Sequence, residues 1–484
     1  MVEKIKRDVG YHDTVIIGAG PAGMFAADEL QKNGIKDILL IDMGKQMDDR
    51  KCNESPKCSC STCDILEGEG GAGGFSDGKK TYSLSRGTQM EELFDEKHAP
   101  ILREIDDTIV RFGGAGRDFD PLPGTPEEFK GSKFEFGSYP LRHIGSDGVR
   151  DLIRGHAEHL RANGVRTWYE AEATHLIVRD GVAIGILIHD RVREDTYEVR
   201  ANRILVATGL QGAPWLEDQL RRSGVNLGSG PAGIGVRIEA AHEVLAPLFD
   251  RFYDFKLVYE HGSLIYRSFC CNQRGYIVNE NHRTLGIRNV NGHSYLDPDL
   301  GSRSSNFAII CKVGLGETHD PQSFVRAIAK SINDLAGGHP VVQTTKDFVH
   351  GNPQAEKEED IALREERLEC AGIRTNHQAR FGPDIAEAMP NKVRDGFRGF
   401  LKELDAVIPG IVSEESLVYA PEVKYYGRKV PVDFNTWECK EIADLYVLGN
   451  ASGYLDSFVS AALSGIIAAR KIIQSKGGNE YAKD

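Results

Sequence analysis

The amino-terminal fold is decided by residues Asp13–Asp42, which read DTVIIGAGPAGMFAADELQKNGIKDILLID. The pattern predicts a β-branched strand over Asp13–Ile17, a glycine turn over Gly18–Gly23, a helix over Met24–Asn33 and a second buried strand over Asp37–Asp42. Strand, G-x-G-x-x-G turn, helix and strand within about thirty residues form the βαβ unit that binds dinucleotides. We therefore expect a nucleotide-binding turn rather than a glycine-rich turn without a ligand.

Each glycine of this turn has its own predicted role. Gly18 permits the tight turn, Gly20 lets backbone N–H groups approach a pyrophosphate, and Gly23 lets the helix pack on the strand. The pyrophosphate would lie at the helix N-terminus, where free N–H groups and the helix dipole favour negative charge. Asp42 ends the second strand, where a carboxylate can accept hydrogen bonds from ribose hydroxyls. The predicted contacts of this unit also include Pro21, Ala22 and Met43.

Composition excludes several classes of protein. The chain has 484 residues, of which 40% are hydrophobic and 27% are charged, so it can bury a large core. A net charge of −13 argues against nucleic-acid or anionic-membrane partners. No apolar run approaches the roughly 20 residues that span a bilayer. No long apolar stretch follows the basic residues near the start, so we expect a cytoplasmic protein without a secretory signal.

Two distant segments favour FAD over NAD as the dinucleotide. Arg203–Gly209 (RILVATG) resembles the strand and turn that return beneath an FAD site. Leu445–Gly453 (LYVLGNASG) resembles the segment that meets the ribityl chain, and the helix predicted over Ser457–Ser475 would point its N-terminus at the flavin pyrimidine ring. The position of the βαβ unit near the start of the chain also favours FAD. The further cofactor contacts predicted are Gly73, Gly74, Ala173, Thr208, Gly209, Gly449, Asn450, Phe458 and Val459.

The chain resembles the uncharacterised FAD-dependent dehydrogenases, a family of the glutathione-reductase-like FAD/NAD(P)-binding flavoproteins. The resemblance covers most of the chain and rests on the glycine turn, a cysteine run, the carboxyl-terminal LGNASG and five further motifs. These motifs are Gly68–Lys79 (GEGGAGGFSDGK), Ile234–Glu239 (IGVRIE), Val290–Tyr295 (VNGHSY), Ser305–Ala308 (SNFA) and Pro421–Tyr426 (PEVKYY). The resemblance implies an α/β fold in which an FAD-binding, Rossmann-like three-layer domain carries an inserted α+β substrate domain. It also implies non-covalent FAD.

We expect a discontinuous FAD-binding domain of residues 1–95, 140–235 and 400–484, with a substrate or cap domain of residues 96–139 and 236–399. A second G-x-G-x-x-G motif lies at Gly228–Gly233. The residues after it, Ile234–Glu239, predict a strand where a nucleotide site needs a helix, so we interpret it as a plain loop. Electrons would then come from the substrate, from NAD(P)H bound transiently, or from a redox partner protein.

Two positions depart from the family pattern near the flavin. Asn450 stands where the family has an acid, although an amide can still bond ribityl hydroxyls. The segment Tyr454–Phe458 lacks the basic residue and the glycine that usually precede the helix. Asp456 in this segment would oppose negative charge on reduced flavin, which bears on the redox potential.

The candidate catalytic residues lie in three of the family motifs. The glycines of Gly68–Lys79 would let backbone approach the isoalloxazine ring, and Lys79 would contact flavin or substrate unless it is merely solvated. Four further side chains are acid–base candidates, each with a hydrogen-bonded structural role as its alternative. These four are His293, Tyr295, Lys424 and Tyr425. Arg237 would bind a substrate carboxylate or a partner acid, or form a surface salt bridge.

A cysteine run has the spacing Cx5CxCx2C and consists of Cys52, Cys58, Cys60 and Cys63. Four thiolates in such a stretch can hold zinc or an iron–sulfur cluster, or form a redox disulfide that relays electrons to flavin. The spacing matches no standard metal knuckle, so we predict no metal and keep these ligands as an alternative. An inert loop with reduced thiols is the third interpretation.

The predicted function is hydride transfer between a small organic substrate and flavin N5, with reoxidation by O2, a nicotinamide or a partner protein. One alternative is an NAD(P)H-dependent FAD monooxygenase or ene-reductase. Another is a non-catalytic, redox-sensing flavoprotein that uses the cysteine run.

Overall fold

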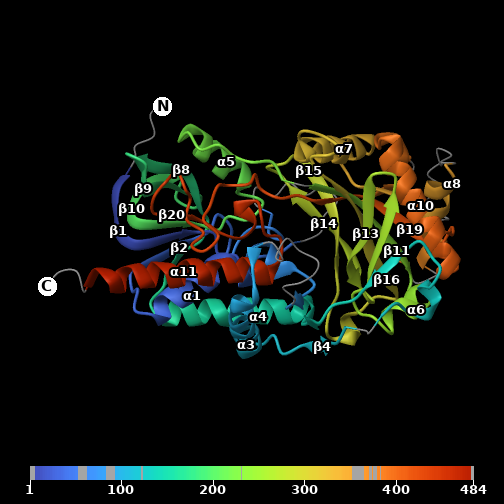
Figure 1. Cartoon of the computed structure of the whole chain (residues 1–484), viewed down its shortest axis with the longest axis horizontal. Coiled ribbons are helices and arrows are strands. Elements are labelled where there is room, and N and C mark those ends of the chain that lie inside the picture. Colours follow the sequence, from blue (N-terminus) through green and yellow to red (C-terminus); the bar gives the residue numbers. More distant parts are fainter. Residues whose placement is uncertain are drawn as a thin grey trace.

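Two β-sheets dominate the chain and lie side by side along its long axis (Figure 1). The computed structural model describes residues 6–52, 63–82, 93–121, 124–230, 232–351, 365–369, 373, 379–381 and 383–480. The first sheet contains both the amino-terminal strand and a strand from the carboxyl-terminal part of the chain. The predicted α/β class, with a Rossmann-like domain and an inserted α+β domain, is confirmed, and the second domain is built on a largely antiparallel sheet.

The first sheet has the strand order β7-β2-β1-β10-β9-β8, and β20 also pairs with β10. Strands β7, β2, β1, β10 and β20 pair in parallel, whereas β9 and β8 add an antiparallel hairpin. The amino-terminal half of β10 pairs with β9, and its carboxyl-terminal half pairs with β20. The bounds are β1 Lys6–Ile17, β2 Ile38–Ile41, β7 Arg166–Trp168, β8 Ala171–Arg179, β9 Val182–Asp190, β10 Asp195–Val206 and β20 Leu445–Val447.

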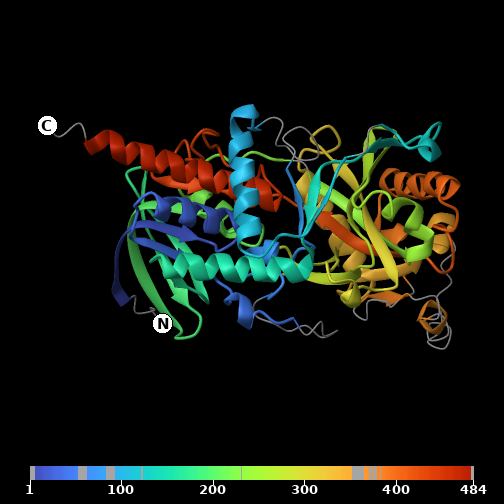
Figure 2. The same cartoon turned by 90° about the horizontal axis from the view of Figure 1, so that it is seen from below.

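Helices cover one face of this sheet, where α1, α4 and α11 lie side by side (Figures 1 and 2). Helix α1 begins at Pro21, because proline suits a first helical position that needs no N–H donor. Close contact between α1 and α11 requires Gly465, since a Cβ there would lie 2.2 Å from the Ala22 carbonyl oxygen. The bounds are α1 Pro21–Lys32, α3 Ala99–Arg111, α4 Gly145–Ala162, α5 Ala213–Arg222 and α11 Phe458–Glu480.

The second sheet has the order β18-β17-β19-β11-β16-β13-β12-β5 and is largely antiparallel. Nine of the ten residues of β11 are buried, because side chains cover both faces of the sheet there. The strands are β5 Glu135–Gly137, β11 Ala232–Ala241, β12 Lys256–His261, β13 Leu264–Asn272, β16 Ser304–Val313, β17 Val341–Thr344, β18 Arg380–Phe381 and β19 Leu417–Lys424. The helices beside it are α6 His242–Phe249, α7 Pro321–Leu335, α8 Thr345–His350 and α10 Asn391–Val407.

Two small sheets complete the described part of the chain. The hairpin β14 Tyr276–His282 and β15 Ile287–His293 forms one of them. Strands β3 Lys79–Thr81, β6 Leu141–His143 and β4 Arg117–Phe119 form the other, in the order β3-β6-β4. The cysteine-rich and glycine-rich residues 50–80 predict a loop by their composition, but they contain the short strand β3 and a 3-10 helix, η2, over Gly71–Phe75.

Several predicted elements agree with the structure and some boundaries move. The sequence near Pro321–Leu335 predicts a helix, and α7 has those bounds. The runs Thr196–Val199 and Arg203–Ala207 predict two strands, and the structure joins them in one continuous β10. The predicted domain boundary at residue 96 assigns helix α3 to the cap domain. The structure instead shows its apolar face buried in the core of the first sheet. Strand β19 lies after the boundary at 400 but belongs to the second sheet. Helix α10 likewise buries its apolar face in the second core.

The second glycine motif leads into a strand. Strand β11 runs from Ala232, so no helix follows the motif, and Gly228 pairs by backbone hydrogen bonds with Lys429. The interpretation as a loop rather than a second nucleotide site agrees with this placement. Among the described residues, no helix is both long and apolar enough to cross a lipid bilayer.

Candidate active site

The glycine turn has the geometry that its sequence predicts. A Cβ at Gly18, where φ is +106°, would lie 2.4 Å from the Ala207 carbonyl oxygen at the end of β10. A Cβ at Gly23 would lie 2.0 Å from the Gly18 carbonyl oxygen and 3.2 Å from Ile16. No side chain fits at either position, because the obstacles are backbone atoms. The turn and the start of α1 are therefore held tightly against two strands of the sheet.

Gly20 lies on the open side of the same turn. The nearest atom to a Cβ there is the Gly71 Cα at 3.9 Å, so Gly20 leaves room above the N-terminus of α1. The first N–H groups of an α-helix have no partner within the helix, and they favour a negatively charged ligand. This combination fits a diphosphate.

The Gly68–Lys79 loop covers this turn. The Gly70 N–H donates to the Ala19 carbonyl oxygen over 2.8 Å. A Cβ at Gly73 would lie 3.0 Å from Pro21 and 3.1 Å from Phe458, whereas one at Gly74 would meet Met47 at 2.8 Å. Helix η2 therefore lies between the first residue of α1 and the first residue of α11. The predicted contacts Pro21, Ala22, Gly73 and Phe458 come together here.

Asp42 is buried at the end of β2 and binds backbone. Its two carboxylate oxygens accept hydrogen bonds from the Ala19 and Gly44 N–H groups over 2.8 and 2.9 Å. A ribose hydroxyl would have to share these oxygens with the backbone donors. The neighbouring Met43 is half-buried, and its carbonyl oxygen accepts from Arg191.

Glu67 is a second acid in this region, which the sequence reasoning missed. Its Oε2 atom is buried without a hydrogen-bond partner among the described residues. Burial raises the pKa of Glu67 to about 7; nearby Arg191 opposes this shift and nearby Asp42 adds to it. An unpartnered carboxyl oxygen close to Asp42 can accept a hydrogen bond from a ribose hydroxyl. The motif that contains the loop begins one residue later, which is why pattern matching passed over Glu67.

The segments that favoured FAD also meet at this end of the first sheet. A Cβ at Gly449 would lie 3.3 Å from the Cβ atoms of Ala22 and Ala461. The Asn450 side-chain oxygen accepts weakly from the Gly427 N–H over 3.4 Å. The Thr208 hydroxyl is buried and has no partner among the described residues. The other predicted contacts lie in or just after the first sheet and in α11: Gly209 follows β10 and has φ +59°, Ala173 of β8 pairs with Ile188 of β9, and Val459 is buried in α11.

Lys79 is enclosed by ion pairs rather than placed against open space. Its Nζ atom donates to the Cys271 carbonyl oxygen over 2.6 Å, and lies 2.8 Å from Asp77 and 3.5 Å from Asp254. Burial alone would lower the pKa of Lys79, but the two carboxylates hold it well above its usual value. Lys256 also pairs with Asp254, over 2.5 Å. The prediction that Lys79 contacts flavin or substrate remains untested, and the solvated alternative does not hold.

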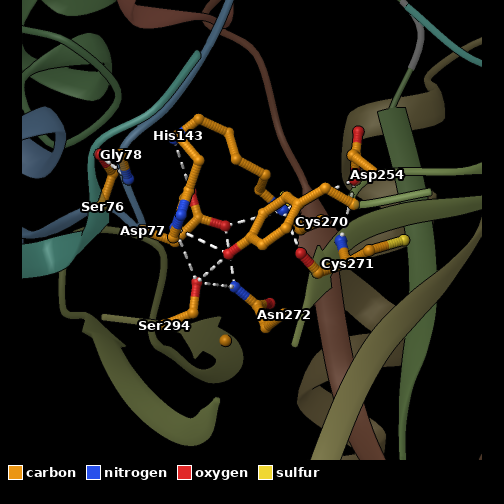
Figure 3. Close-up of polar contacts among 12 residues, drawn as sticks. Ser76, Asp77, Gly78, His143, Asp254, Cys270, Cys271, Asn272 and Ser294 are labelled. Carbon is orange, nitrogen blue, oxygen red and sulfur yellow. Dashed lines mark hydrogen bonds and ion pairs between the residues drawn. The ribbon is translucent and has the colours of Figure 1, made fainter. Parts of the chain in front are cut away.

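A second buried network lies around Asp77, which is the ion-pair partner of Lys79 (Figure 3). The His143 Nε2 atom lies 2.7 Å from the Tyr253 hydroxyl and 3.2 Å from the Ser294 hydroxyl. The Asn272 amide donates to Asp77 over 2.8 Å. Burial lowers the pKa of His143 to about 4, so its imidazole is neutral. These contacts join the glycine-rich loop to the cap domain.

Replacing His143 with glutamine is expected to flatten the dependence of stability on pH. In the unfolded chain this histidine takes up a proton near pH 6.5, but in the folded chain only near pH 4. Stability is therefore lost as pH falls through that window, by up to about 3 kcal/mol. Urea unfolding of both proteins at several pH values measures the difference. The exposed His319→Gln control should keep the wild-type slope, and a wild-type slope in His143→Gln would contradict the assignment.

Arg237 is fully buried, and its partners are residues of this chain. It donates to both carboxylate oxygens of Glu422 over 2.7 and 2.8 Å. It also donates to the Cys270 carbonyl oxygen and to the amide oxygens of Asn272 and Asn306. The structure shows a salt bridge, but the prediction of a surface salt bridge is wrong, because both Arg237 and Glu422 are buried.

Of the four acid–base candidates, two end strands and the other two, Tyr295 and Tyr425, lie just after those strands. His293 ends β15 and is buried, and burial lowers its pKa. Lys424 ends β19, and its Nζ atom lies 4.3 Å from the centre of the Phe269 ring. The two strands are linked by a hydrogen bond from the Val423 N–H to the Asn289 side chain. Tyr295 packs edge-on against Tyr276, and Tyr425 is half-buried against the core of the second sheet, with its pKa raised by burial.

The cysteine run is only partly described. Cys58 and Cys60 lie outside the described residues, Cys52 is exposed, and burial raises the pKa of Cys63 to about 11. No group of three or more metal-binding side chains occurs within the described ranges. The redox and metal roles of this run stay as alternatives.

Comparison with known proteins agrees with this geometry. Residues 11–108 match the sequence profile of the FAD binding domain. An uncharacterized protein of Clostridium beijerinckii is 24% identical over 489 residues, which cover 95% of this chain and 80% of the relative. Together with the glycine turn, the domain match confirms FAD as the cofactor and an FAD-dependent oxidoreductase as the class of enzyme.

Solved structures show only a distant likeness to this chain. A geranylgeranyl bacteriochlorophyll reductase-like protein of Thermoplasma acidophilum has a TM-score of 0.44 at 13% identity, covering 98% of this chain and 81% of that one. The 3-ketosteroid-delta4-(5alpha)-dehydrogenase of Rhodococcus jostii has a TM-score of 0.43 at 13% identity, covering 97% and 98%. The function proposed below therefore rests on the residues of this chain.

Proposed function

We propose that the chain is a dehydrogenase or oxidase that moves hydride between a small organic substrate and FAD at the junction of its two domains. One observation carries this proposal. The Gly68–Lys79 loop contacts the nucleotide-binding turn through Gly70 and Gly73, and contacts the cap through Asp77 and Lys79. A cofactor that follows this loop from its diphosphate end would reach the cap.

Bound FAD would supply a two-electron acceptor at its N5 atom. The chain itself would hold the diphosphate at the N-terminus of α1, where Gly20 leaves the room, while Gly18 and Gly23 allow the tight turn and its close packing. Loss of a hydride from a C–H bond next to a hydroxyl or amine leaves a proton that a base must take. His293 suits this role, because burial keeps its imidazole neutral below the usual pKa of histidine.

Lys424 would orient an anionic substrate. Burial lowers the pKa of its ammonium group, but the nearby Cys270 and Glu422 outweigh that effect and the pKa is raised. The group is therefore charged at neutral pH. The Phe269 ring beside it offers an apolar surface. A small organic acid with an oxidisable C–H bond is the substrate class that fits both groups.

Anaerobic titration tests this function. Purified protein reconstituted with FAD is mixed with NADH, with NADPH and with a panel of hydroxy and amino acids, while flavin absorbance near 450 nm is followed. Bleaching by a panel member alone supports the proposal. Bleaching by NADPH only when a second substrate is present would instead indicate a monooxygenase. Protein that binds FAD but is bleached by none of these reductants would contradict an oxidoreductase of this type.

Replacing His293 with glutamine is expected to slow flavin reduction by the substrate by about 10²–10⁴-fold, the usual contribution of a positioned base. FAD binding should be retained. The acid limb of the wild-type pH–rate profile should lie below pH 6.5, because the pKa of His293 is lowered. Stopped-flow absorbance measures both effects, with the exposed His319→Gln variant as the matched control. An unchanged rate in His293→Gln would remove this residue from the mechanism.

A further inference from the structure

Lys80 is a buried cation with no partner among the described residues. The residue is 1% exposed, and its Nζ atom makes no hydrogen bond in that part of the chain. Successive side chains of a strand point to opposite faces. In β3, Lys79 turns toward Asp77 and Asp254, and Lys80 turns to the other face. There its Nζ atom lies 3.6 Å from the centre of the Phe458 ring.

Phe458 is the first residue of α11, a helix of 23 residues. The first turn of a long helix carries a partial positive charge, and in α11 the Ser457 hydroxyl already accepts from one of its N–H groups, that of Ser460, over 3.1 Å. The Phe458 ring also lies against Gly73, whose Cβ position is 3.0 Å from Pro21, the first residue of α1. The Phe458 ring and Gly73 therefore connect the Lys80 amine with the first residues of α11 and α1.

The acidic side chains on the surrounding elements form ion pairs or hydrogen bonds with residues other than Lys80. Asp77 pairs with Lys79, and the exposed Asp456 just before α11 accepts from the Tyr426 hydroxyl. Across the strand pair, the neighbour of Lys80 is Arg142 on β6, another cation. Arg142 itself pairs with Asp106 of α3 and with Asp118 of β4. The phenol of Tyr82, two residues after Lys80, stays neutral, because burial and Asp106 raise its pKa.

An isolated buried ammonium is costly, and the group usually loses its proton instead. Burial lowers the pKa of Lys80 to about 7, and only Asp77 opposes that effect. A lysine kept in such a place is explained if an anionic ligand joins it. Lys80 is placed beside the first residue of α11, where a positive charge and the helix dipole would act on the same ligand.

We propose that Lys80 and the N-terminus of α11 form the binding site for a negative charge carried by FAD. This inference deepens the proposed function and rests on it. Two parts of FAD carry such a charge, namely the diphosphate and the ring in its reduced, anionic form. In either case Lys80 would take up a proton as the negative charge arrives, because an adjacent anion favours the charged form of lysine.

The test compares the wild type with Lys80→Met and Lys80→Arg, and uses Lys330→Met as the control. Lys330 forms an exposed pair with Asp334, far from any of these groups in the sequence. Methionine keeps the length of the side chain and removes a buried unpaired charge, so the variant should fold. The measurements are the affinity for ADP, the affinity for oxidised FAD and the midpoint potential of bound flavin. Proton uptake on FAD binding at pH 8 is measured by calorimetry in two buffers.

The two candidate charges on FAD, the diphosphate and the reduced ring, give different experimental results. If the diphosphate is the ligand, Lys80→Met should weaken binding of ADP and FAD alike, by tenfold or more. If the reduced ring is the ligand, ADP affinity should be unchanged while reduced FAD loses tenfold relative to oxidised FAD. That change lowers the two-electron potential by about 30 mV. In both cases Lys80→Arg should stay close to the wild type, and in the first case Lys80→Met should also lose the proton uptake.

An ADP affinity, an FAD affinity and a potential that all match the wild type in Lys80→Met would overturn this inference alone. Wild-type protein that takes up no FAD would instead overturn the function on which it rests. The two failures are therefore distinguishable in one set of measurements.

Discussion

Replacing Arg237 with methionine is expected to lower the free energy of unfolding by about 3–5 kcal/mol, the usual cost of breaking a buried ion pair from one side. Both Arg237 and Glu422 are fully buried, and the guanidinium makes two parallel hydrogen bonds to the carboxylate. Without Arg237, the buried Glu422 carboxylate loses the cation that donates to both of its oxygens. The oxygens of Asn272 and Asn306 would also lose a donor.

Urea unfolding followed by circular dichroism measures this loss. The matched control is Arg221→Met, which removes an exposed arginine from an i,i+4 pair with Glu217 and should cost about 0.5 kcal/mol or less. The double variant Arg237→Met/Glu422→Gln should recover part of the stability, because no unpaired charge remains. A loss below about 1 kcal/mol in the single variant would mean that water or a shifted side chain replaces the arginine.

Replacing Gly23 with alanine is expected to disrupt the nucleotide-binding turn and weaken FAD binding by at least about tenfold. The new methyl group would lie 2.0 Å from the Gly18 carbonyl oxygen, so α1 must move away from β1. Overpacking of this kind costs about 1–3 kcal/mol, and each 1.4 kcal/mol lost from binding is a factor of ten. Fluorescence titration with FAD measures the affinity.

Gly148→Ala is the matched control, since Gly148 lies in α4 and its Cβ position is 3.5 Å from the nearest atom, on Ile144. Alanine in a helix interior should stabilise the protein by about 0.5–1 kcal/mol and leave FAD binding unchanged. Wild-type affinity in Gly23→Ala would show that α1 can shift without harming the turn, and would argue against the tight packing described above.

The nucleotide-binding unit could be predicted because its determinants are local. The strand, the turn and the helix of Asp13–Asp42 are encoded within thirty residues, and so is the obstacle at Gly23, which is the Gly18 carbonyl oxygen. The obstacle at Gly18 is not local, because the Ala207 carbonyl oxygen comes from the end of β10. Helix α7 could also be predicted, because the residues that repeat with helical spacing cover the same range, Pro321–Leu335, as the observed helix. The interpretation of Gly228–Gly233 as a loop rested on the same kind of local evidence.

The surroundings of Lys79 and Lys80 could not be predicted, because their determinants are distant in sequence. The partners of Lys79 include Asp254 and the Cys271 carbonyl oxygen, which reach it only through the fold. Strand β3 has three residues and stands in a stretch that reads as a loop. Its alternation places the two lysines on opposite faces, a signal that is visible only once the strand is known.

The order of strands in the first sheet has a consequence for synthesis on the ribosome. Strand β1 and helix α1 are synthesised early. Their sheet and helix layer are completed only by β20, which pairs with β10, and by α11, which packs on α1, and both of these elements follow residue 444. Strands β11 to β19, which form most of the second sheet, emerge before either of them. The cap can therefore fold while the nucleotide-binding half is still incomplete. We expect a nascent chain released before β20 to carry a formed cap and to retain no FAD.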